Sequence, residues 1–534
     1  MKFPATKSSK FHPRTAMGPG ASLRWSPLLL ALLAPAVVGA DSGLPQMQQG
    51  IQIGDLAPGR AVVWSRCDRP ARMMVTYAFN PQFNDAHTVR GPYALEVSDF
   101  TARQDLVGLP EGRDVFVKVW FEDLTNARSK SEPELGQFHT IGRRDDIRFI
   151  WGGDTAGQGW GINLAFGGMK IYETMRRRQP QFFIQSGDNV YSDGPIPESK
   201  TVENGQVWTN LVTPEVAKVA ETLDEFRGRY KYNLLDANLR RFNAEVPQIW
   251  QWDDHEVVNN WSDSKDLSGD TRYTEKNVPL LVGRATRAFL EYAPLRPHTA
   301  EEPERVYRKI SYGPLLDVFV IDMRNYRGPN THNLQTSEGP ATAFLGEAQL
   351  VWLKQELKRS GAVWKVISAD MPIGLNISDD FEHTPPQRWE AVANGNDGPP
   401  AGRELEIARL LRYIKDQPIR NIVWLTADVH YTAAHYYDPT KAQTRQFKPF
   451  WEFIAGPLNA GTFGPIATDG TFGPQVVFSK GAPAGQSNLS PYAGLQFFGE
   501  VSIDRRTRAM TVDLRDIQGD SVFSKTLKPE TGKR

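Results

Sequence analysis

The stretch that decides the fold is Phe182-Phe183-Ile184-Gln185-Ser186-Gly187-Asp188-Asn189-Val190-Tyr191. Its apolar run stops at Ser-Gly-Asp, and a short apolar run closed by glycine is typical of a buried strand that leaves its sheet. In open α/β sheets, the residues just beyond the carboxyl end of a strand face the ligand crevice. We therefore expect Asp188 and Tyr191 to lie at such an edge, a carboxylate and a phenol within one turn of each other.

The same pattern, a strand-like run that ends in aspartate, occurs six times along the chain. The aspartates are Asp154, Asp188, Asp253 with Asp254, Asp322, Asp370 and Asp428. A single one has a simpler explanation, because Asp is common in turns and at helix N-caps. The series is different, because parallel strands gather their ends at one edge, where unpaired carboxylates repel one another and favour a bound cation.

Three histidines, His255, His430 and His435, follow or lie near these strand ends. Imidazole nitrogen together with carboxylate oxygen, without cysteine, favours Fe, Mn, Zn or Ca over an iron–sulfur centre. His435 is either a ligand or a packed loop residue. We expect Asp253 to be a partner of His255 rather than a metal ligand.

The pattern of strands and helices divides the chain into regions. Short strand-like runs punctuated by Gly and Pro predict a small all-β sandwich of the immunoglobulin or fibronectin kind over residues 46–141. Over residues 146–516, strands alternate with helical patterns, which favours a parallel α/β domain. A polar insertion at 194–245 is expected to be helical in part, from Val216 to Tyr232, and residues 517–534 are expected to form a C-terminal tail.

The amino-terminal residues have the order of a secretory signal peptide. Basic residues precede an apolar run at 28–38, and Gly39-Ala40 completes a small-residue cleavage site. We therefore predict a signal peptide over residues 1–40 and a periplasmic, cell-surface or extracellular location. A non-cleaved anchor is the alternative. No later stretch is apolar enough to cross a membrane, so no integral span is expected in the mature chain.

Composition narrows the classes of function. Lys+Arg and Asp+Glu both total 62, so no global charge favours a nucleic acid or an anionic membrane, and no specific nucleic-acid partner is predicted. Cys67 is the single cysteine of the chain, so no intramolecular disulfide can form. Stability must come from the core and from any bound metal.

Four motifs in sequence order carry a resemblance to known enzymes. Gly153-Asp154, Gly187 to Tyr191, Asp253-Asp254-His255-Glu256 and Asp428-Val429-His430 resemble the motifs of calcineurin-like metallophosphoesterases. The Asp-Asp-His-Glu stretch, followed by Val257 to Trp261, is similar to that of the alkaline phosphatase D (PhoD-like) family, in which a small β domain precedes the phosphatase domain. The resemblance covers nearly everything after the signal peptide and implies a metallophosphoesterase fold, a layered α/β/β/α sandwich.

The resemblance also implies two metal ions. The first, Fe³⁺, would be held by Asp154, Tyr191 and His430, and Asp188 would bridge both ions. The ligands of the second, a divalent cation, would be Asp254, Asp370 and Asp428. This Asp-rich set favours Ca²⁺ as the second ion, with Zn²⁺ or Mn²⁺ as alternatives. At the first site this sequence departs from the family, because many family members have a cysteine where Asp154 stands.

Further roles follow from the same resemblance. His255 would act as the general acid or orient the phosphate, and Asn259 and Arg324 would contact the phosphate. Asp322 and Arg324 can equally form a structural salt bridge.

The expected function is that of an exported metal-dependent phosphatase. It would hydrolyse small phosphomonoesters, phosphodiesters or both by attack of metal-activated hydroxide, with a histidine protonating the leaving alkoxide. One alternative is a phospholipase- or nucleotidase-type phosphodiesterase selected by the 194–245 insertion. Another is a non-catalytic cell-surface metal-binding protein, which would have no use for His255.

Overall fold

The computed structural model describes residues 43–530 except 127, 203 and 381. The expected signal peptide, residues 1–40, lies outside the described residues. The described residues from Leu44 onward group into one compact unit. None of the helices in the described part combines the length and the apolar character that crossing a membrane requires.

The first sheet has nine strands in the order β22-β21-β20-β8-β9-β12-β1-β2-β5. Strands β8, β9 and β12 run parallel, and β1 lies parallel beside β12, whereas the remaining pairs are antiparallel. The bounds are β1 Ile51–Ala57, β2 Arg60–Arg66, β5 Thr101–Val107, β8 Ile147–Gly152, β9 Phe182–Ser186, β12 Gln248–Gln251, β20 Phe497–Ile503, β21 Met510–Asp516 and β22 Ser521–Leu527.

Strand β22 lies within residues 517–534, which the sequence suggested as a tail. Its backbone pairs with β21, so the sheet continues to Leu527. Its side chains are half-buried or exposed, as is typical of an edge strand. The sequence of the strand therefore lacks the clear alternation of apolar and polar residues by which a strand is predicted. Phe523 stacks on Phe478 of the seven-stranded sheet described below, with ring centroids 5.1 Å apart.

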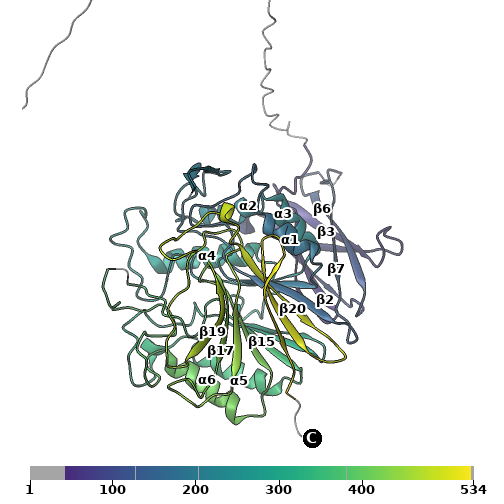
Figure 1. Ribbon diagram of the computed structural model, residues 1–534. Helices are drawn as coiled ribbons and strands as arrows, with labels where there is room; N and C mark the ends of the chain where they lie inside the picture. The colour runs from purple at the N-terminus through teal and green to yellow at the C-terminus, as the bar shows by residue number, and fades with distance from the viewer. Residues whose placement is uncertain (1–42, 127, 203, 381, 531–534) are drawn as a thin grey trace, which may run out of the picture. The chain divides into compact units, whose positions relative to one another are not determined.

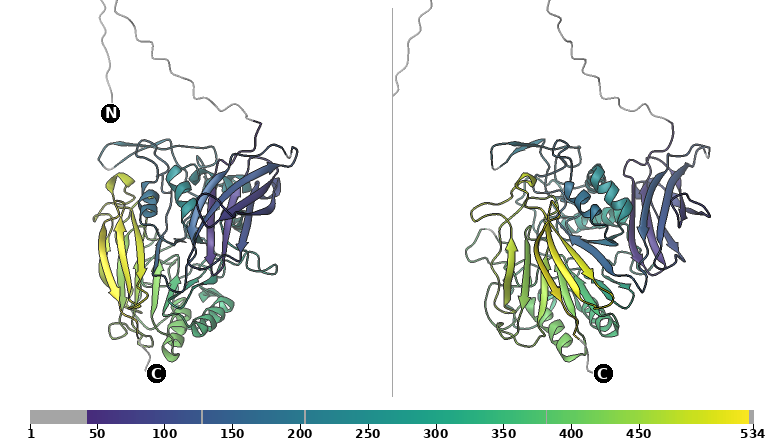
Figure 2. Two further views of the ribbon diagram at one scale, coloured as in Figure 1. Left: turned by 90° about the vertical axis from the view of Figure 1, so that its right-hand side faces the viewer. Right: turned by 45° about the vertical axis from the view of Figure 1, so that its right-hand side comes forward.

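An N-terminal β domain is confirmed. Part of it belongs to the nine-stranded sheet, which also contains strands from the rest of the chain. Strands β1, β2 and β5 extend the nine-stranded sheet, and a four-stranded antiparallel sheet in the order β4-β3-β6-β7 belongs to the same region. The bounds of the second set are β3 Ala71–Ala78, β4 His87–Ala94, β6 Asp114–Asp123 and β7 Glu134–His139. Figure 2 shows these strands together on one side of the unit.

The third sheet has seven strands in the order β13-β14-β15-β16-β18-β17-β19, and β14, β15, β16 and β18 are parallel. Its bounds are β13 Arg308–Tyr312, β14 Leu316–Val320, β15 Trp364–Ser368, β16 Ile422–Thr426, β17 Thr432–Tyr437, β18 Phe450–Ile454 and β19 Pro474–Lys480. A separate hairpin joins β10 Ser199–Thr201 to β11 Val207–Thr209.

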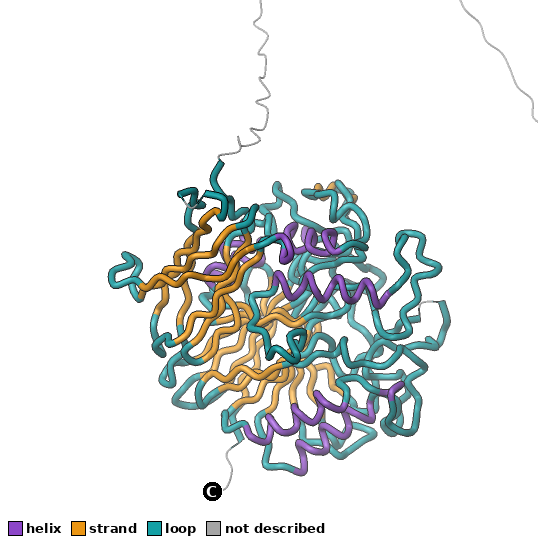
Figure 3. Tube along the Cα trace, turned by 180° about the vertical axis from the view of Figure 1, so that it is seen from behind, coloured by secondary structure: helices purple, strands orange, loops and turns teal. Residues whose placement is uncertain are grey.

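Helices pack on the outer faces of the two large sheets (Figures 1 and 3). Tyr172, Phe242 and Phe289 bring α1, α3 and α4 against the first sheet, whereas Leu353 and Leu410 bring α5 and α6 against the seven-stranded sheet. The helices are α1 Lys170–Arg177, α2 Leu223–Asn233, α3 Ala237–Glu245, α4 Val278–Tyr292, α5 Glu347–Arg359 and α6 Glu404–Asp416, with short 3-10 helices at Glu96–Ser98, Pro340–Thr342 and Pro491–Ala493.

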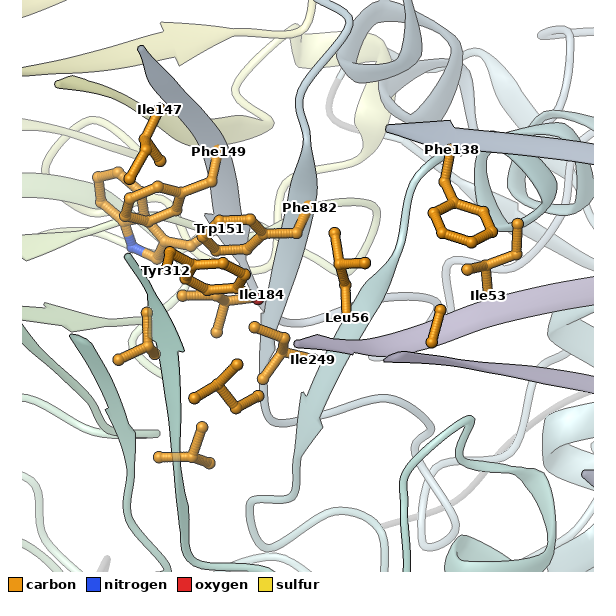
Figure 4. Packing of buried hydrophobic residues seen from close by; sticks show 14 of the residues in the cluster. Ile53, Leu56, Phe138, Ile147, Phe149, Trp151, Phe182, Ile184, Ile249 and Tyr312 are labelled. Carbon is orange, nitrogen blue, oxygen red and sulfur yellow. The ribbon is translucent and has the colours of Figure 1, made fainter. Parts of the chain in front are cut away.

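The main core lies between the large sheets (Figure 4). Side chains alternate along a strand, so Phe182 and Ile184 of β9 enter this core while Phe183 packs with the helices. Phe182 stacks between Phe149 and Tyr312, at centroid distances of 4.7 and 4.3 Å. Each such buried ring contributes roughly 1.5–3 kcal/mol, and together they fix the register that brings the strand ends to one place.

The 194–245 insertion holds two helices where the sequence suggested one from Val216 to Tyr232. The first begins at Leu223 because Thr222 caps it, forming a capping box with Glu225. It ends at Asn233, and Asp236 caps a second helix by accepting hydrogen bonds from the backbone of Asn238 and Leu239. The caps, rather than the apolar pattern, set these boundaries.

Candidate metal centre

The strand-end aspartates come from two sheets, not from one edge as the sequence suggested. Strands β8, β9 and β12 of the nine-stranded sheet precede Asp154, Asp188 and Asp253-Asp254, whereas β14, β15 and β16 of the seven-stranded sheet precede Asp322, Asp370 and Asp428. Side-chain contacts join the two sets of strand ends. Trp151 Nε1 donates to the carbonyl of Thr426 at 3.2 Å, and Ser368 Oγ donates to Gln251 Oε1 at 2.6 Å.

Two groups of ligand atoms converge at this junction. Asp154, Asp188 and His430 form one group, and Asp188, Asp254 and His255 form the other; in each group the atoms lie within 4.8 Å of one another. Asp188 belongs to both. This arrangement supports the bridging role that the resemblance implied, although the role itself stays a prediction.

Tyr191 and His430 are oriented by contacts within the site. The Tyr191 hydroxyl lies 2.8 Å from His430 Nε2, and its ring packs on His255 with centroids 4.4 Å apart. His430 Nδ1 lies 2.6 Å from the carbonyl oxygen of Gly461 and donates to it, which leaves Nε2 as the donor atom for a metal. Burial lowers the pKa of His430 to about 4, so the ring is neutral, as a ligand must be.

The donor set fits metal ions. Both carboxylate oxygens of Asp154, and one oxygen each of Asp254 and Asp370, are buried without a hydrogen-bond partner. Burial raises the pKa of Asp154 and Asp188, and neighbouring carboxylates raise both further. Because buried, unpartnered carboxylates are costly, cations are the natural partners of these oxygens.

Several of these side chains sit on strained backbone. Asp154, Asp188, Asp428 and His430 have φ values of 63°, 48°, 70° and 58°. The left-handed region costs an L-residue roughly 1–2 kcal/mol, less for Asp. Strain of this kind clusters at functional sites, where the surrounding structure holds it.

Asp370 and Asp428 face a buried arginine. Arg324 has a fully buried guanidinium whose Nε lies 2.7 Å from Asp253 and 3.1 Å from Asp370. It also pairs with Glu390, and Asp428 lies 4.0 Å away. Neither Asp370 nor Asp428 joins the two converging groups.

Comparisons with known proteins identify the family. A family model described as PhoD-like phosphatase matches residues 149–514, and the model of the N-terminal domain of PhoD-like phosphatases matches residues 33–142. The chain belongs to the PhoD-like phosphatase family. This confirms the resemblance that the motifs suggested.

Individual relatives of this PhoD-like phosphatase agree. Alkaline phosphatase D of Bacillus subtilis (strain 168) is 30% identical over 306 residues, a match that covers 54% of this chain and 48% of the relative's length. A solved PhoD structure matches with a TM-score of 0.66 and 19% identity over 90% of this chain and 89% of that one. A purple acid phosphatase from yellow lupin (Lupinus luteus) seeds matches with a TM-score of 0.53 and 12% identity over 91% and 74%. At these identities, both structures show the fold alone.

The partner of His255 in this PhoD-like phosphatase is Asp193, not Asp253 as expected. His255 Nδ1 lies 2.7 Å from Asp193 Oδ1, and Asp193 Oδ2 accepts from the backbone N–H of Asn259 at 2.9 Å. Burial lowers the pKa of His255, but Asp193 and Asp254 outweigh it and raise that pKa well above its ordinary value. Asp193 was not among the residues predicted from the sequence, although its place five residues after Asp188 in the same loop was a signal for it.

Asn259 and Arg324 lie in different surroundings, although both were expected to contact phosphate. Asn259 is half-buried, and its backbone N–H donates to Asp193, the partner of His255. The buried pairing of Arg324 leaves none of its side chain exposed. The suggested side-chain salt bridge with Asp322 is wrong, because Asp322 Oδ1 accepts from the backbone N–H of Arg324 at 2.9 Å while the guanidinium pairs elsewhere.

His435 lies outside both groups of the PhoD-like site. It is buried within β17, with Nδ1 3.2 Å from Glu452 Oε2, and Tyr437 donates to the same oxygen at 2.7 Å. Of the two interpretations of His435, the structure favours the packed residue.

Proposed function

We propose that this PhoD-like phosphatase is a metal-dependent phosphoric ester hydrolase that acts on small phosphomonoesters, phosphodiesters or both. The observation that carries the proposal is the convergence of Asp154, Asp188, Asp254, His255 and His430, with carboxylate oxygens that lack partners. The α/β/β/α layering of a metallophosphoesterase is part of the same proposal, and the outer helices and paired sheets support it.

Asp154, Tyr191 and His430 would hold one ion, Asp188 would be shared, and Asp254 would serve the other. When bound, two such ions neutralise phosphate charge and make water a strong nucleophile at neutral pH. We propose Fe³⁺ for the phenol-containing site and a divalent cation, Ca²⁺, Zn²⁺ or Mn²⁺, for the other. Asp370, whose unpartnered oxygen is not the one paired with Arg324, and Asp428, 4.0 Å from that arginine, would complete the second site.

His255 is suited to hold and deliver a proton. The contact between Asp193 and Nδ1 fixes the orientation of the imidazole ring and therefore the position of Nε2. The surrounding carboxylates favour the protonated ring. A positioned histidine of this kind contributes about 10²–10⁴-fold when it protonates a leaving alkoxide. The half-buried Asn259 stays a candidate for phosphate contact.

The test is turnover of p-nitrophenyl phosphate and bis-p-nitrophenyl phosphate by the purified chain, with and without a chelator. We expect turnover that the chelator removes and added metal restores. His255→Ala should abolish turnover and leave the metal content nearly unchanged, whereas His332→Ala, at an exposed position, should change neither. Negligible turnover with every metal would favour the metal-binding alternative, and strong diester preference would favour the phosphodiesterase alternative.

Export is a separate proposal that rests on the signal-peptide pattern of residues 1–40. The N-terminal sequence of the protein recovered from cell fractions tests it. A new N-terminus near Asp41 outside the cytoplasm supports export, and an intact N-terminus in the cytoplasm refutes it.

A further inference from the structure

Glu256 is the next residue in sequence after His255, but it belongs to neither converging group of ligand atoms. Its side chain is directed into the protein, and the residue is 1% exposed. Oε1 accepts two hydrogen bonds from Asn189, from the backbone N–H at 2.6 Å and from the side-chain amide at 2.8 Å. Oε2 accepts from the backbone N–H of Asp253 at 2.9 Å.

The two hydrogen bonds from Asn189 join loops that are 67 residues apart in sequence, and the third, from Asp253, holds Glu256 within its own loop. Asn189 directly follows Asp188, the residue shared by both groups of ligand atoms, and Asp253 directly precedes Asp254. One carboxylate therefore connects the loop after β9 to the loop after β12, at the residue next to each ligand.

The contacts around Asn189 complete this connection. Its side-chain amide also donates to the carbonyl of Gln251, the last residue of β12, at 2.8 Å, and its own carbonyl accepts from Asn233 at 2.7 Å. Asp188 has a left-handed backbone with φ of 48°. A hydrogen bond to the next backbone N–H is well placed to hold such a conformation.

We propose that Glu256 is a positioning residue of the metal centre, whose carboxylate sets the separation and orientation of Asp188 and Asp254. The proposal rests on the metal centre proposed above. Carboxylates that orient metal ligands from behind commonly change metal affinity by about 10–100-fold when they are replaced.

Glu256→Gln is the direct test, because the amide keeps the size of the side chain but replaces one acceptor oxygen with a donor. Glu406→Gln is a matched control. Glu406 is also buried, and its two oxygens likewise accept from backbone N–H groups, of Phe344 and Leu345, but it lies on α6 away from the ligand groups. Both variants should lose thermal stability, whereas only the first should lose metal affinity.

The measurement is titration of the metal-free chain with Mn²⁺ alone, at a temperature where circular dichroism shows each protein to be folded. We expect the dissociation constant of Glu256→Gln to rise about 10–100-fold, with that of Glu406→Gln unchanged within threefold. Saturating Mn²⁺ should restore turnover of Glu256→Gln, a rescue that His255→Ala should not show. Equal affinities for Glu256→Gln and the unsubstituted chain would overturn the proposal.

Two further outcomes are decisive. If Glu256→Gln does not fold, Asn189→Ala replaces it. That change removes the side-chain donor to Glu256 and to the Gln251 carbonyl but keeps the backbone donor to Glu256; a weaker Mn²⁺ affinity supports the proposal, and an unchanged affinity overturns it. If the unsubstituted chain binds no Mn²⁺, Fe, Zn²⁺ or Ca²⁺, the metal centre itself is refuted and the role of Glu256 with it.

Discussion

Replacing Arg324 with Met should destabilise the protein more than it impairs substrate binding. The guanidinium has no exposed surface and forms ion pairs with Asp253, Asp370 and Glu390. Met removes the charge but keeps much of the volume. Three buried carboxylates would then lack their common cation, and each would have to take up a proton or remain ionised without a partner.

The magnitude follows from this geometry. Removing one partner of a buried ion pair costs about 3–5 kcal/mol. Unfolding entropy of about 2.1 cal/mol/K per residue, applied to residues 44–534, gives roughly 1 kcal/mol/K. The Tm should therefore fall by about 3–5 °C if unfolding is cooperative.

Differential scanning calorimetry and steady-state kinetics with p-nitrophenyl phosphate check this prediction together. Arg324→Lys keeps a charge without the planar fork and should give an intermediate loss. Arg359→Met is the control, because its guanidinium is 67% exposed and pairs with Glu356 at the surface, where such pairs contribute about 0–1 kcal/mol. An unchanged Tm for Arg324→Met with a large rise in KM would refute the buried-cation interpretation and support the phosphate contact suggested by the sequence.

Three further predictions follow. Asp193→Asn should lower kcat by about 10²–10⁴-fold with little change in metal content, because His255 loses the carboxylate that fixes its Nδ1. Gly157→Ala should reduce metal content and activity, because a Cβ there would lie 2.1 Å from the Tyr191 ring. Burial raises the pKa of Glu404 from its ordinary value of 4.5 to about 9 in the folded protein. Between these two pH values the folded state binds a proton that the unfolded state has lost. The free energy of unfolding should therefore fall as the pH rises, by up to about 1.4 kcal/mol per pH unit. Glu404→Gln should remove this slope in urea denaturation at pH 5–9.

Each of these has a control or a contrary outcome. Gly283→Ala meets no atom within 4 Å and lies in α4, so it should preserve metal content and stabilise the helix by about 1 kcal/mol. Full activity in Asp193→Asn would remove the histidine–aspartate pair from the chemistry. An identical pH slope in Glu404→Gln and the unsubstituted chain would place the titration in another group.

The strand-end pattern predicted much of the site, because its physical basis is local. An apolar run that stops at Gly187-Asp188 indicates a buried strand and a polar edge regardless of the rest of the fold. Helix α6 was likewise visible in the sequence as Glu404–Asp416, because its apolar spacing is regular.

The partition into two sheets was not visible, because strands β9 and β16 look alike in sequence and their neighbours are chosen by packing across the core. Side-chain partners over long separations were equally hidden. Arg324 and Asp253 are 71 residues apart, and nothing in either stretch shows that the guanidinium, rather than His255, would take that carboxylate.

Strand β1 pairs in parallel with β12, through Gly54 opposite Gln248, and this join has a practical consequence for dissecting the protein. A fragment starting near residue 146 would leave one flank of β12 with unsatisfied backbone donors and acceptors. Such a flank recruits strands from other molecules, so we expect the isolated C-terminal fragment to self-associate when expressed alone. The amino-terminal region thus covers an otherwise exposed strand edge of the sheet that carries Asp188 and Asp254.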